Sequence, residues 1–326
     1  MNILVTGAAG YIGSVVTEEL IGEGHRVVAF DNLSQGHRQA LSPGAILIRG
    51  DLARKEDLDS VFHAQTVEAV VHLAADSLVE ASVRDPAKYF QSNVVNGLNL
   101  LSAMLEHGVT RIVFSSTAAV YGEPESFPID EGHPEHPVNT YGESKLMFEK
   151  ILGRFREAYG MSFISLRYFN AAGASRRCGE DHRPETHLIP RILKVALGEE
   201  RHIPVYGTDY DTPDGTCIRD YVHVVDIARA HTLALKALDR IGGAVFNLGS
   251  SHGYSVMEVV EAAREITGAA IPIWQQPRRA GDPARLVASY ARIQSELGWQ
   301  PDGSDLKSII GSAWDWQKGR PHGYED

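Results

Sequence analysis

The sequence is poor in cysteine and has no long hydrophobic run. Only two cysteines, Cys178 and Cys217, occur among 326 residues, too few for a disulfide framework and typical of free thiols in a reducing cytoplasm. No apolar segment approaches the roughly 18 to 20 residues that span a membrane. The first residues form a short apolar run without a basic leader, which predicts a buried strand rather than a signal peptide. We therefore expect a cytoplasmic globular protein with no membrane partner.

Positive charge is also scarce. The chain has 31 Lys and Arg against 42 Asp and Glu, a formal net charge of -11. This charge opposes non-specific binding to nucleic acid, so we expect no nucleic-acid partner. Any anionic ligand must be held by local donors, because the overall field repels it.

Short β-branched runs alternate with segments of helical length over residues 1–170. The runs predict strands at Ile3–Val5, Val27–Phe30, Ile46–Ile48, Ala69–Leu73, Ile112–Phe114 and Phe163–Leu166. Strands separated by helices predict an α/β fold with a doubly wound parallel sheet, because no tight turn reaches a parallel partner. A proline-rich stretch over 121–140 predicts a long loop.

Beyond residue 170 the alternation weakens, although a helix is predicted at Val224–Leu238 and a strand at Ala244–Leu248. Over 171–326 we expect a smaller α/β domain, partly interleaved with the first domain (1–170). The first domain is expected to use parts of 219–250 as well.

A glycine-rich loop joins the first predicted strand to a helix. Gly7, Gly10 and Gly13 follow the spacing G-x-x-G-x-x-G. Glycine lets the backbone turn and approach a pyrophosphate, and the following helix N-terminus offers free N–H donors. The same spacing also fits a plain tight turn, so the loop alone leaves both interpretations open.

The next predicted strand ends in a carboxylate. Asp31 stands 18 residues after Gly13, where an acid can accept hydrogen bonds from an adenosine ribose. Because its charge would repel a 2′-phosphate, it favours NAD over NADP. In the alternative interpretation, Asp31 and Asn32 only cap the turn that follows.

A tyrosine and a lysine four residues apart open a later amphipathic segment. Tyr141 and Lys145 would lie on one helix face, and Thr117 belongs to a hydroxyl cluster 24 residues before Tyr141. An ammonium one turn away, together with a cationic nicotinamide, would favour the phenolate and make Tyr141 a base near neutral pH. The alternative is an exposed helix face, which most Y-x-x-x-K patterns represent.

These motifs together resemble the extended short-chain dehydrogenase/reductase superfamily and, within it, the UDP-sugar 4-epimerases. The resemblance runs almost from end to end through V-T-G-A-A-G-Y-I-G, F-D-N-L, H-L-A-A, S-S-T-A-A-V-Y-G, Y-G-E-S-K, L-R-Y-F-N, R-D-Y-V-H-V-V-D, R-R-A-G-D and W-D-W-Q-K-G-R-P-H-G-Y. It implies a Rossmann-like fold, tightly bound NAD and interconversion of UDP-galactose and UDP-glucose through a transient 4-keto sugar and bound NADH. It also implies a homodimer built from helices near Tyr89–His107 and Tyr141–Tyr159.

The resemblance assigns site residues by matching positions. The implied catalytic residues are Thr117, Tyr141 and Lys145. Tyr141 and Lys145 are also implied to contact NAD, together with Gly7, Gly10, Tyr11, Ile12, Gly13, Asp31, Asn32, Asp51, Leu52, Ala74, Ala75, Asn93 and Tyr168. The UDP-sugar would contact Thr117, Tyr141, Asn170, Leu188, Tyr206, Arg219, Arg279, Asp282 and Leu286. His187 stands where some members have Asn, and Ser77 where some have Lys.

Other functions are compatible with parts of the same sequence pattern. Leu286 borders the sugar pocket in the family pattern, and its intermediate size predicts some acceptance of N-acetylated sugars. A 4-epimerase of UDP-N-acetylhexosamine or UDP-hexuronic acid is thus an alternative, and a non-catalytic NAD sensor is a more remote one. Cys178, His182 and His187 lie close together in the sequence, but their spacing matches no usual zinc pattern, so we predict no metal.

Overall fold

The computed structural model describes residues 1–279 and 282–325, which divide into two compact units. Unit 1 comprises Met1–Glu123, Pro134–Tyr168 and Ala228–Phe246, and unit 2 comprises Pro124–His133, Phe169–Ile227 and Asn247–Asp326. Each unit is therefore assembled from three separate chain segments. No helix in the described residues is long and apolar enough to cross a bilayer.

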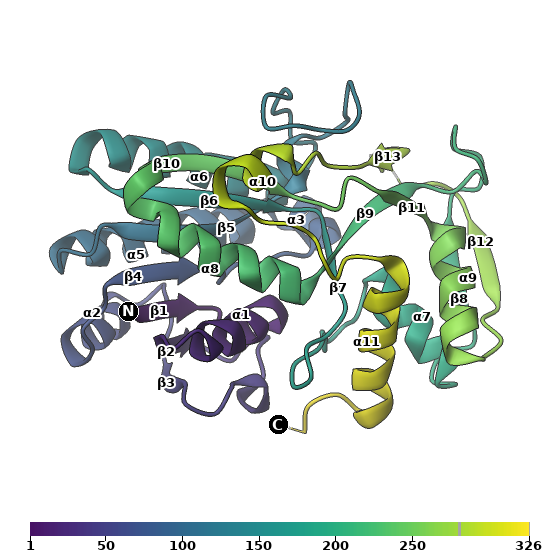
Figure 1. The fold of residues 1–326 in the computed structure, drawn as a ribbon, viewed down its shortest axis with the longest axis horizontal. Coiled ribbons are helices and arrows are strands. Elements are labelled where there is room, and N and C mark those ends of the chain that lie inside the picture. Colours follow the sequence, from purple (N-terminus) through teal and green to yellow (C-terminus); the bar gives the residue numbers. More distant parts are fainter. Residues whose placement is uncertain (280–281, 326) are drawn as a thin grey trace. The chain divides into compact units, whose positions relative to one another are not determined.

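Unit 1 is built on a seven-stranded sheet in the described chain (Figure 1), with the strand order β10-β6-β5-β4-β1-β2-β3. Its strands are β1 (Asn2–Thr6), β2 (Arg26–Asp31), β3 (Ile46–Arg49), β4 (Ala69–His72), β5 (Arg111–Thr117), β6 (Ser162–Tyr168) and β10 (Gly243–Leu248). The pairs from β3 to β6 are all parallel, so the carboxyl ends of these strands share one edge. The strand positions and the doubly wound, Rossmann-like α/β class predicted from the sequence are confirmed.

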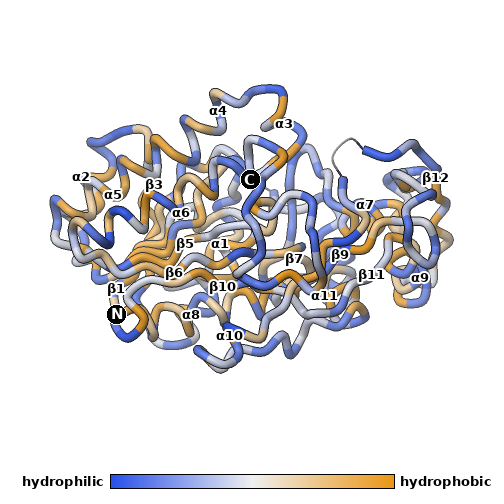
Figure 2. Tube along the Cα trace, turned by 90° about the horizontal axis from the view of Figure 1, so that it is seen from above, coloured by the Kyte–Doolittle hydropathy of each residue, from blue (hydrophilic) through white to orange (hydrophobic). Residues whose placement is uncertain are grey.

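Helices cover both faces of this sheet. They are α1 (Tyr11–Gly22), α2 (Lys55–Ala64), α3 (Val79–Arg84), α4 (Pro86–Phe90), α5 (Asn96–Glu106), α6 (Thr140–Tyr159) and α8 (Val224–Ile241). Figure 2 shows α2, α5 and α6 on one side of the strands and α8 on the other. A fully buried layer that includes Leu58, Leu100 and Phe148 seals the first side against the sheet.

Helix α6 is fixed at both ends by its sequence. The Asn139 side chain accepts a hydrogen bond from the Gly142 N–H at 2.9 Å, and Gly160 ends the helix in the left-handed conformation. A Cβ at position 142 would meet the Ala119 carbonyl oxygen at 2.4 Å, so glycine there lets the start of α6 pack closely on the turn after β5. The start of α6 is where Tyr141 lies.

Unit 2 holds shorter strands and four described helices. The strands are β7 (Asn170–Ala172), β8 (Ile203–Tyr206), β9 (Ile218–His223), β11 (Gly253–Ser255), β12 (Ile273–Gln276) and β13 (Arg285–Leu286), and the helices are α7 (Leu188–Ala196), α9 (Val256–Thr267), α10 (Ala291–Leu297) and α11 (Leu306–Gly319). Strand β9 pairs with β7, β11 and β13, while β8 pairs with β12. Ile192, Val259 and Ile310 are fully buried between α7, α9 and α11.

The long loop after β5 corrects the predicted domain boundaries. Pro124–His133 groups with unit 2 rather than with residues 1–170. The physical reason is backbone pairing: the Ile129 N–H donates to the Val287 carbonyl at 2.8 Å, and the Ser289 N–H donates to the Ile129 carbonyl at 2.7 Å. Pairing between residues so distant in sequence leaves no local pattern. Neither Cys178 nor Cys217 forms a disulfide, as the composition predicts, and both are buried.

Candidate active site

The glycine loop makes a tight junction between β1 and α1. The Gly7 N–H donates to the Phe30 carbonyl at 2.9 Å, and Gly7 has a φ of 71°. A Cβ at Gly13 would lie 2.0 Å from the Gly7 carbonyl oxygen, so only glycine fits there. No side chain caps α1 at Gly10, and its first turn holds no acidic residue. This bare helix N-terminus suits an anionic group such as a pyrophosphate.

Asp31 lies at the carboxyl end of β2 and is buried. One carboxylate oxygen accepts from the Ala9 N–H at 2.9 Å, and the other accepts from the Leu33 N–H at 2.8 Å. Asp31 therefore does cap a turn, but it also fixes the glycine loop. A carboxylate has about four acceptor sites, so both oxygens retain capacity for a further donor. Burial raises the pKa of Asp31, while the two N–H donors lower it.

The other residues predicted to contact a dinucleotide follow the neighbouring strands. Asn32 donates to the Asp51 carboxylate at 3.0 Å, and Asp51 also accepts from the Ala53 N–H at 2.9 Å. Tyr11 and Ile12 open α1 after the glycine loop, Leu52 follows Asp51, and Ala74, Ala75 and the exposed Ser77 follow β4. Since β1 to β4 are parallel, all of these positions lie along one edge of the sheet.

Tyr141, Lys145 and Thr117 come together at the end of β5. The Lys145 ammonium lies 6.0 Å from the centre of the Tyr141 ring and donates to the Ser115 carbonyl at 2.8 Å. A hydrogen bond links Thr117 to the Tyr141 hydroxyl. The helical spacing and the strand end thus produce the predicted cluster. The hydrogen bond from Lys145 to the Ser115 carbonyl was not predicted, because residue types do not show which backbone carbonyl a side chain will reach.

Burial dominates the electrostatics of this cluster in the protein alone. Desolvation raises the pKa of Tyr141 to about 12, with the Thr117 hydrogen bond acting in the opposite direction. Burial lowers the pKa of Lys145 to about 7, partly countered by the Glu149 carboxylate. In the protein alone, Tyr141 is therefore a poor base at neutral pH. Burial thus opposes the effect of a nearby positive charge on the phenol, and the spacing of Tyr141 and Lys145 does not reveal it.

A turn of π-helix at Gln91–Val95 places Asn93 beneath α6. The Asn93 amide donates to the Ser144 hydroxyl at 3.0 Å and to the Asp76 carbonyl at 3.0 Å, and it accepts from the Asp76 N–H at 2.9 Å. Such turns often occur at functional positions. Asn93 thereby ties the loop after β4 to the helix that carries Tyr141 and Lys145.

Two further sets of interacting side chains lie around the carboxyl ends of β5 and β6 in unit 1. The hydroxyl of Tyr168 lies 2.5 Å from Nε2 of His231, both being buried. Arg167 pairs with Glu149 at 2.5 Å and donates to the Tyr121 hydroxyl at 2.9 Å. It also pairs with Glu135, and Glu149 accepts from Ser116. This buried network holds β5, β6 and α6 in register.

Apart from Thr117 and Tyr141, the residues predicted to bind a nucleotide sugar lie in unit 2, where several of them meet. Arg219 forms an ion pair with Asp282, and its register partner across β9 and β13 is Leu286. The Arg279 guanidinium lies 4.0 Å from the centre of the Tyr206 ring. Two guanidinium groups on neighbouring segments suit a diphosphate.

Leu188 and Asn170 complete the predicted set in unit 2. Leu188 packs on a buried cluster formed by Val205, Tyr210, Cys217 and Val256. Asn170 pairs with Tyr221, two residues after Arg219 on β9. The structure thus joins Arg219, Asp282 and Leu286 directly, and it places Asn170 beside the next part of the same strand.

A glycine loop at the first crossover of a 3-2-1-4-5-6 parallel sheet defines the class of dinucleotide-binding α/β proteins. The chain belongs to the NAD dependent epimerase/dehydratase family, whose sequence profile matches residues 3–249. It is 50% identical to the UDP-glucose 4-epimerase of Halalkalibacterium halodurans, over 99% of this chain and 98% of that protein. These findings confirm the resemblance that the motifs indicate.

Solved structures agree with this assignment. A crystal structure of UDP-glucose 4-epimerase matches with a TM-score of 0.97 and 49% identity, over 100% of both chains. UDP-glucose 4-epimerase from Bifidobacterium longum, in complex with NAD+ and UDP, matches with a TM-score of 0.94 and 37% identity, over 99% of this chain and 100% of that one.

Proposed function

We propose that this protein is an NAD-dependent 4-epimerase that interconverts UDP-galactose and UDP-glucose. The observation that carries the proposal is the cluster of Thr117, Tyr141 and Lys145 at the same sheet edge as the glycine loop and Asp31. The relatives described above supply the substrate class. Carbon 4 of a hexose has no acidic C–H, so simple deprotonation does not invert it.

The residues of unit 1 would hold NAD and move the proton. Bound NAD supplies a hydride acceptor and, once reduced, a hydride donor. The glycine loop and the N-terminus of α1 would hold its pyrophosphate, and Asp31 would accept from the adenosine ribose. Tyr141 would exchange the proton of the sugar 4-hydroxyl, with Thr117 hydrogen-bonded to the same phenol. Lys145, held by the Ser115 carbonyl, would favour the ionised form of the phenol whenever its ammonium is protonated.

The residues of unit 2 would hold the nucleotide. Arg219 and Arg279 would donate to the diphosphate, and Asp282 would orient Arg219 through their ion pair. Leu188, Tyr206 and Asn170 are proposed contacts of the same ligand. Strong contacts to the nucleotide combined with weak contacts to the sugar would let the sugar turn over between the two hydride transfers.

Leu286 is proposed to set the size of the sugar accepted. It lies on β13 beside Arg219 and is partly exposed. A leucine at position 286 leaves more room for the sugar than a tyrosine would. This supports some 4-epimerase activity on UDP-N-acetylhexosamines as well.

We also propose a homodimer formed through α5, α6 and the helical turns before α5. Val95 and Met147 lie on these helices with 41% and 39% of their surfaces exposed, and exposed apolar side chains on paired helices suit a protein interface. Sedimentation of the purified protein tests this, since a monomer would contradict it. The cytoplasm remains the proposed compartment, supported by two free, buried cysteines.

The decisive experiment is an end-point assay in which the purified protein, without added NAD, is incubated separately with UDP-galactose, UDP-N-acetylgalactosamine and UDP-galacturonate. Separation of the products by chromatography should reveal UDP-glucose from UDP-galactose. The Tyr141→Phe variant should be at least about 10²-fold slower, whereas Tyr159→Phe, which alters an exposed tyrosine at the far end of α6, should retain activity. No conversion of any substrate by the wild-type protein, even after NAD is supplied, would overturn the proposal.

A further inference from the structure

A second cluster of functional side chains lies in the segment that precedes α7. Glu180, His182, Glu185 and His187 follow the spacing E-x-H-x-x-E-x-H. One ligand atom from each residue lies within 4.8 Å of all the others. Both histidines lie close to Cys178 in the sequence, whereas in the structure their neighbours in the cluster are the two glutamates.

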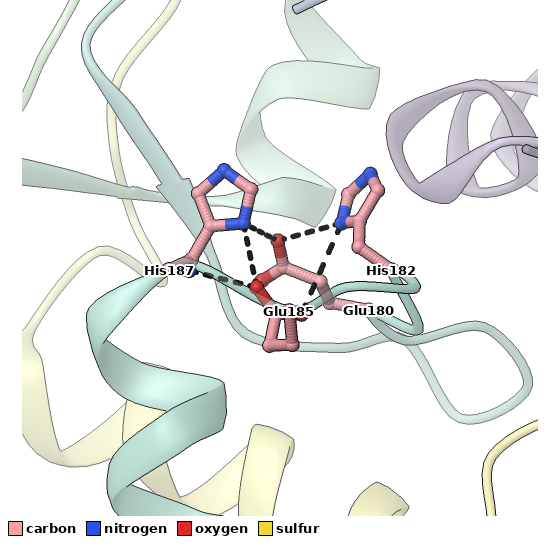
Figure 3. A group of neighbouring side chains, drawn as sticks. All are labelled: Glu180, His182, Glu185 and His187. Carbon is pink, nitrogen blue, oxygen red and sulfur yellow. Dashed lines mark hydrogen bonds and ion pairs between the residues drawn. The ribbon is translucent and has the colours of Figure 1, made fainter. Parts of the chain in front are cut away.

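The donor atoms of this cluster face one another. Nδ1 of His187 lies 2.7 Å from the Glu180 carboxylate and 2.8 Å from the Glu185 carboxylate. Nδ1 of His182 lies 3.1 Å from Glu180 and 4.0 Å from Glu185. Figure 3 shows both Nδ1 atoms turned toward the carboxylates and both Nε2 atoms turned away from them. Two imidazoles and two carboxylates therefore share one centre.

These separations suit a small dication. Tetrahedral coordination with metal–ligand distances of about 2.0 to 2.2 Å places neighbouring ligand atoms about 3.3 to 3.6 Å apart. The four imidazole–carboxylate separations of 2.7 to 4.0 Å bracket that range, and all four ligand atoms lie within 4.8 Å of one another. Movements of up to about 1 Å would bring the four atoms to tetrahedral spacing. Two imidazole nitrogens favour zinc or a similar transition metal over calcium or magnesium.

Burial of the two carboxylates adds an electrostatic reason. The Glu180 and Glu185 side chains are only 7% and 3% exposed. Two carboxylates shielded from water need a compensating positive charge. The ion pairs with the two imidazoles can supply it, and a divalent cation bound between the same four groups would supply it as well. The imidazoles, which are 25% and 46% exposed, leave an approach from solvent.

The segment that carries the cluster is anchored to the end of the chain. Arg183 donates to the Asp181 carboxylate at 2.9 Å and to the Tyr324 carbonyl at 2.8 Å. The Tyr324 N–H donates to the same carboxylate at 2.9 Å, and the Tyr324 hydroxyl accepts from the Gly179 N–H at 3.2 Å. Gly179, Asp181 and Arg183, which make these bonds, lie beside and between the residues of the cluster. The bonds therefore hold the backbone of the cluster in place without a metal.

We propose that Glu180, His182, Glu185 and His187 form a binding site for one transition-metal dication of the zinc class. The site lies within unit 2 and is separate from the cluster of Thr117, Tyr141 and Lys145 in unit 1. Its role is structural: the metal would join the two ends of the segment that leads into α7.

The test uses the full chain without an affinity tag, treated with a chelator and then dialysed against Zn2+ or Co2+ separately. Elemental analysis should find one metal per chain, and Co2+ should give the strong visible absorption of a tetrahedral site. His182→Ala and Glu185→Gln should each weaken binding at least tenfold, since changes even to residues around metal ligands commonly cost about 10 to 100-fold. His252→Ala, which alters an exposed histidine of unit 2 outside the cluster, should bind metal as the wild type does.

Two results would overturn the proposal. One is a folded wild-type chain that retains no metal after dialysis. The other is retention by His182→Ala and Glu185→Gln at the wild-type affinity, which would place the metal elsewhere. Circular dichroism of each variant checks that it is folded, so that lost binding reports lost ligands.

Discussion

Replacement of Lys145 by methionine should stabilise unit 1 of the cofactor-free protein. The lysine side chain is 3% exposed, and its ammonium has one described hydrogen bond, to the Ser115 carbonyl, and lies 4.8 Å from the centre of the Phe114 ring. Burial lowers its pKa from 10.5 to about 7. Folding therefore removes a proton from Lys145 or keeps a poorly solvated charge, and either is unfavourable at neutral pH.

The size of the effect follows from the two pKa values. Between about pH 7 and pH 10.5 the unfolded chain holds a proton on Lys145 that the folded chain lacks. In this window the free energy of unfolding rises by about 1.36 kcal/mol per pH unit through this group. From about pH 7.5 to pH 9.0 the gain is about 2 kcal/mol, and at pH 7.5 the methionine variant should be more stable by up to about 4 kcal/mol.

Urea unfolding at the two pH values measures the effect. All four tryptophans lie in unit 2, so their fluorescence follows that unit, while far-UV circular dichroism follows both. The stability difference between Lys145→Met and the wild type should shrink by about 2 kcal/mol as the pH rises. Lys150→Met, which alters an exposed lysine of the same helix, should show the wild-type pH dependence. Parallel pH dependence of Lys145→Met and the wild type would refute the reasoning.

Four further predictions concern the site and its support. Tyr141→Phe should lower turnover about 10²- to 10⁴-fold, because it removes the proton carrier, while spectroscopy finds NAD still bound. Asp31→Ala should weaken NAD binding in a titration, because it loses both the ribose acceptor and the bond to the glycine loop; unchanged binding would rule out that role. Glu149→Gln should lower the free energy of urea unfolding by about 3 to 5 kcal/mol, since it leaves a buried Arg167 without its main counter-charge. Leu286→Tyr should reduce the rate with UDP-N-acetylgalactosamine relative to that with UDP-galactose, and an unchanged ratio in the same assay would contradict the proposed size limit.

The sequence predicted the parts of the site that depend on local spacing. Strand ends, glycine spacing and the four-residue step from Tyr141 to Lys145 are local features, and a parallel sheet necessarily gathers strand ends at one edge. The same reasoning placed the hydroxyl cluster of Ser115, Ser116 and Thr117 there, and the family resemblance singled out Thr117 among the three. The pKa of Tyr141 could not be predicted this way, because its direction depends on burial by residues far away in the chain.

Long-range pairing is the other part that local patterns did not predict. The ion pair of Arg167 with Glu149 joins a strand to a helix, and neither residue has a periodic signal for the other. Ile129 pairs with residues near 288, which moves a loop predicted for the first domain into the second. Glu180 and Glu185 were not predicted as metal ligands, because only cysteine and histidine spacings were compared with zinc patterns.

The seventh strand of unit 1 has a consequence for synthesis on the ribosome. Strand β10 begins 75 residues after β6 ends, although the two are neighbours in the sheet. At about 5 to 20 residues per second, the ribosome needs about 4 to 15 seconds to deliver it. During that interval the nascent chain carries β6 as an open edge, which is the kind of strand that pairs with other chains. Protection of that edge, for example by a chaperone, matters most in these seconds, and a fragment that stops near residue 170 would keep the edge open permanently.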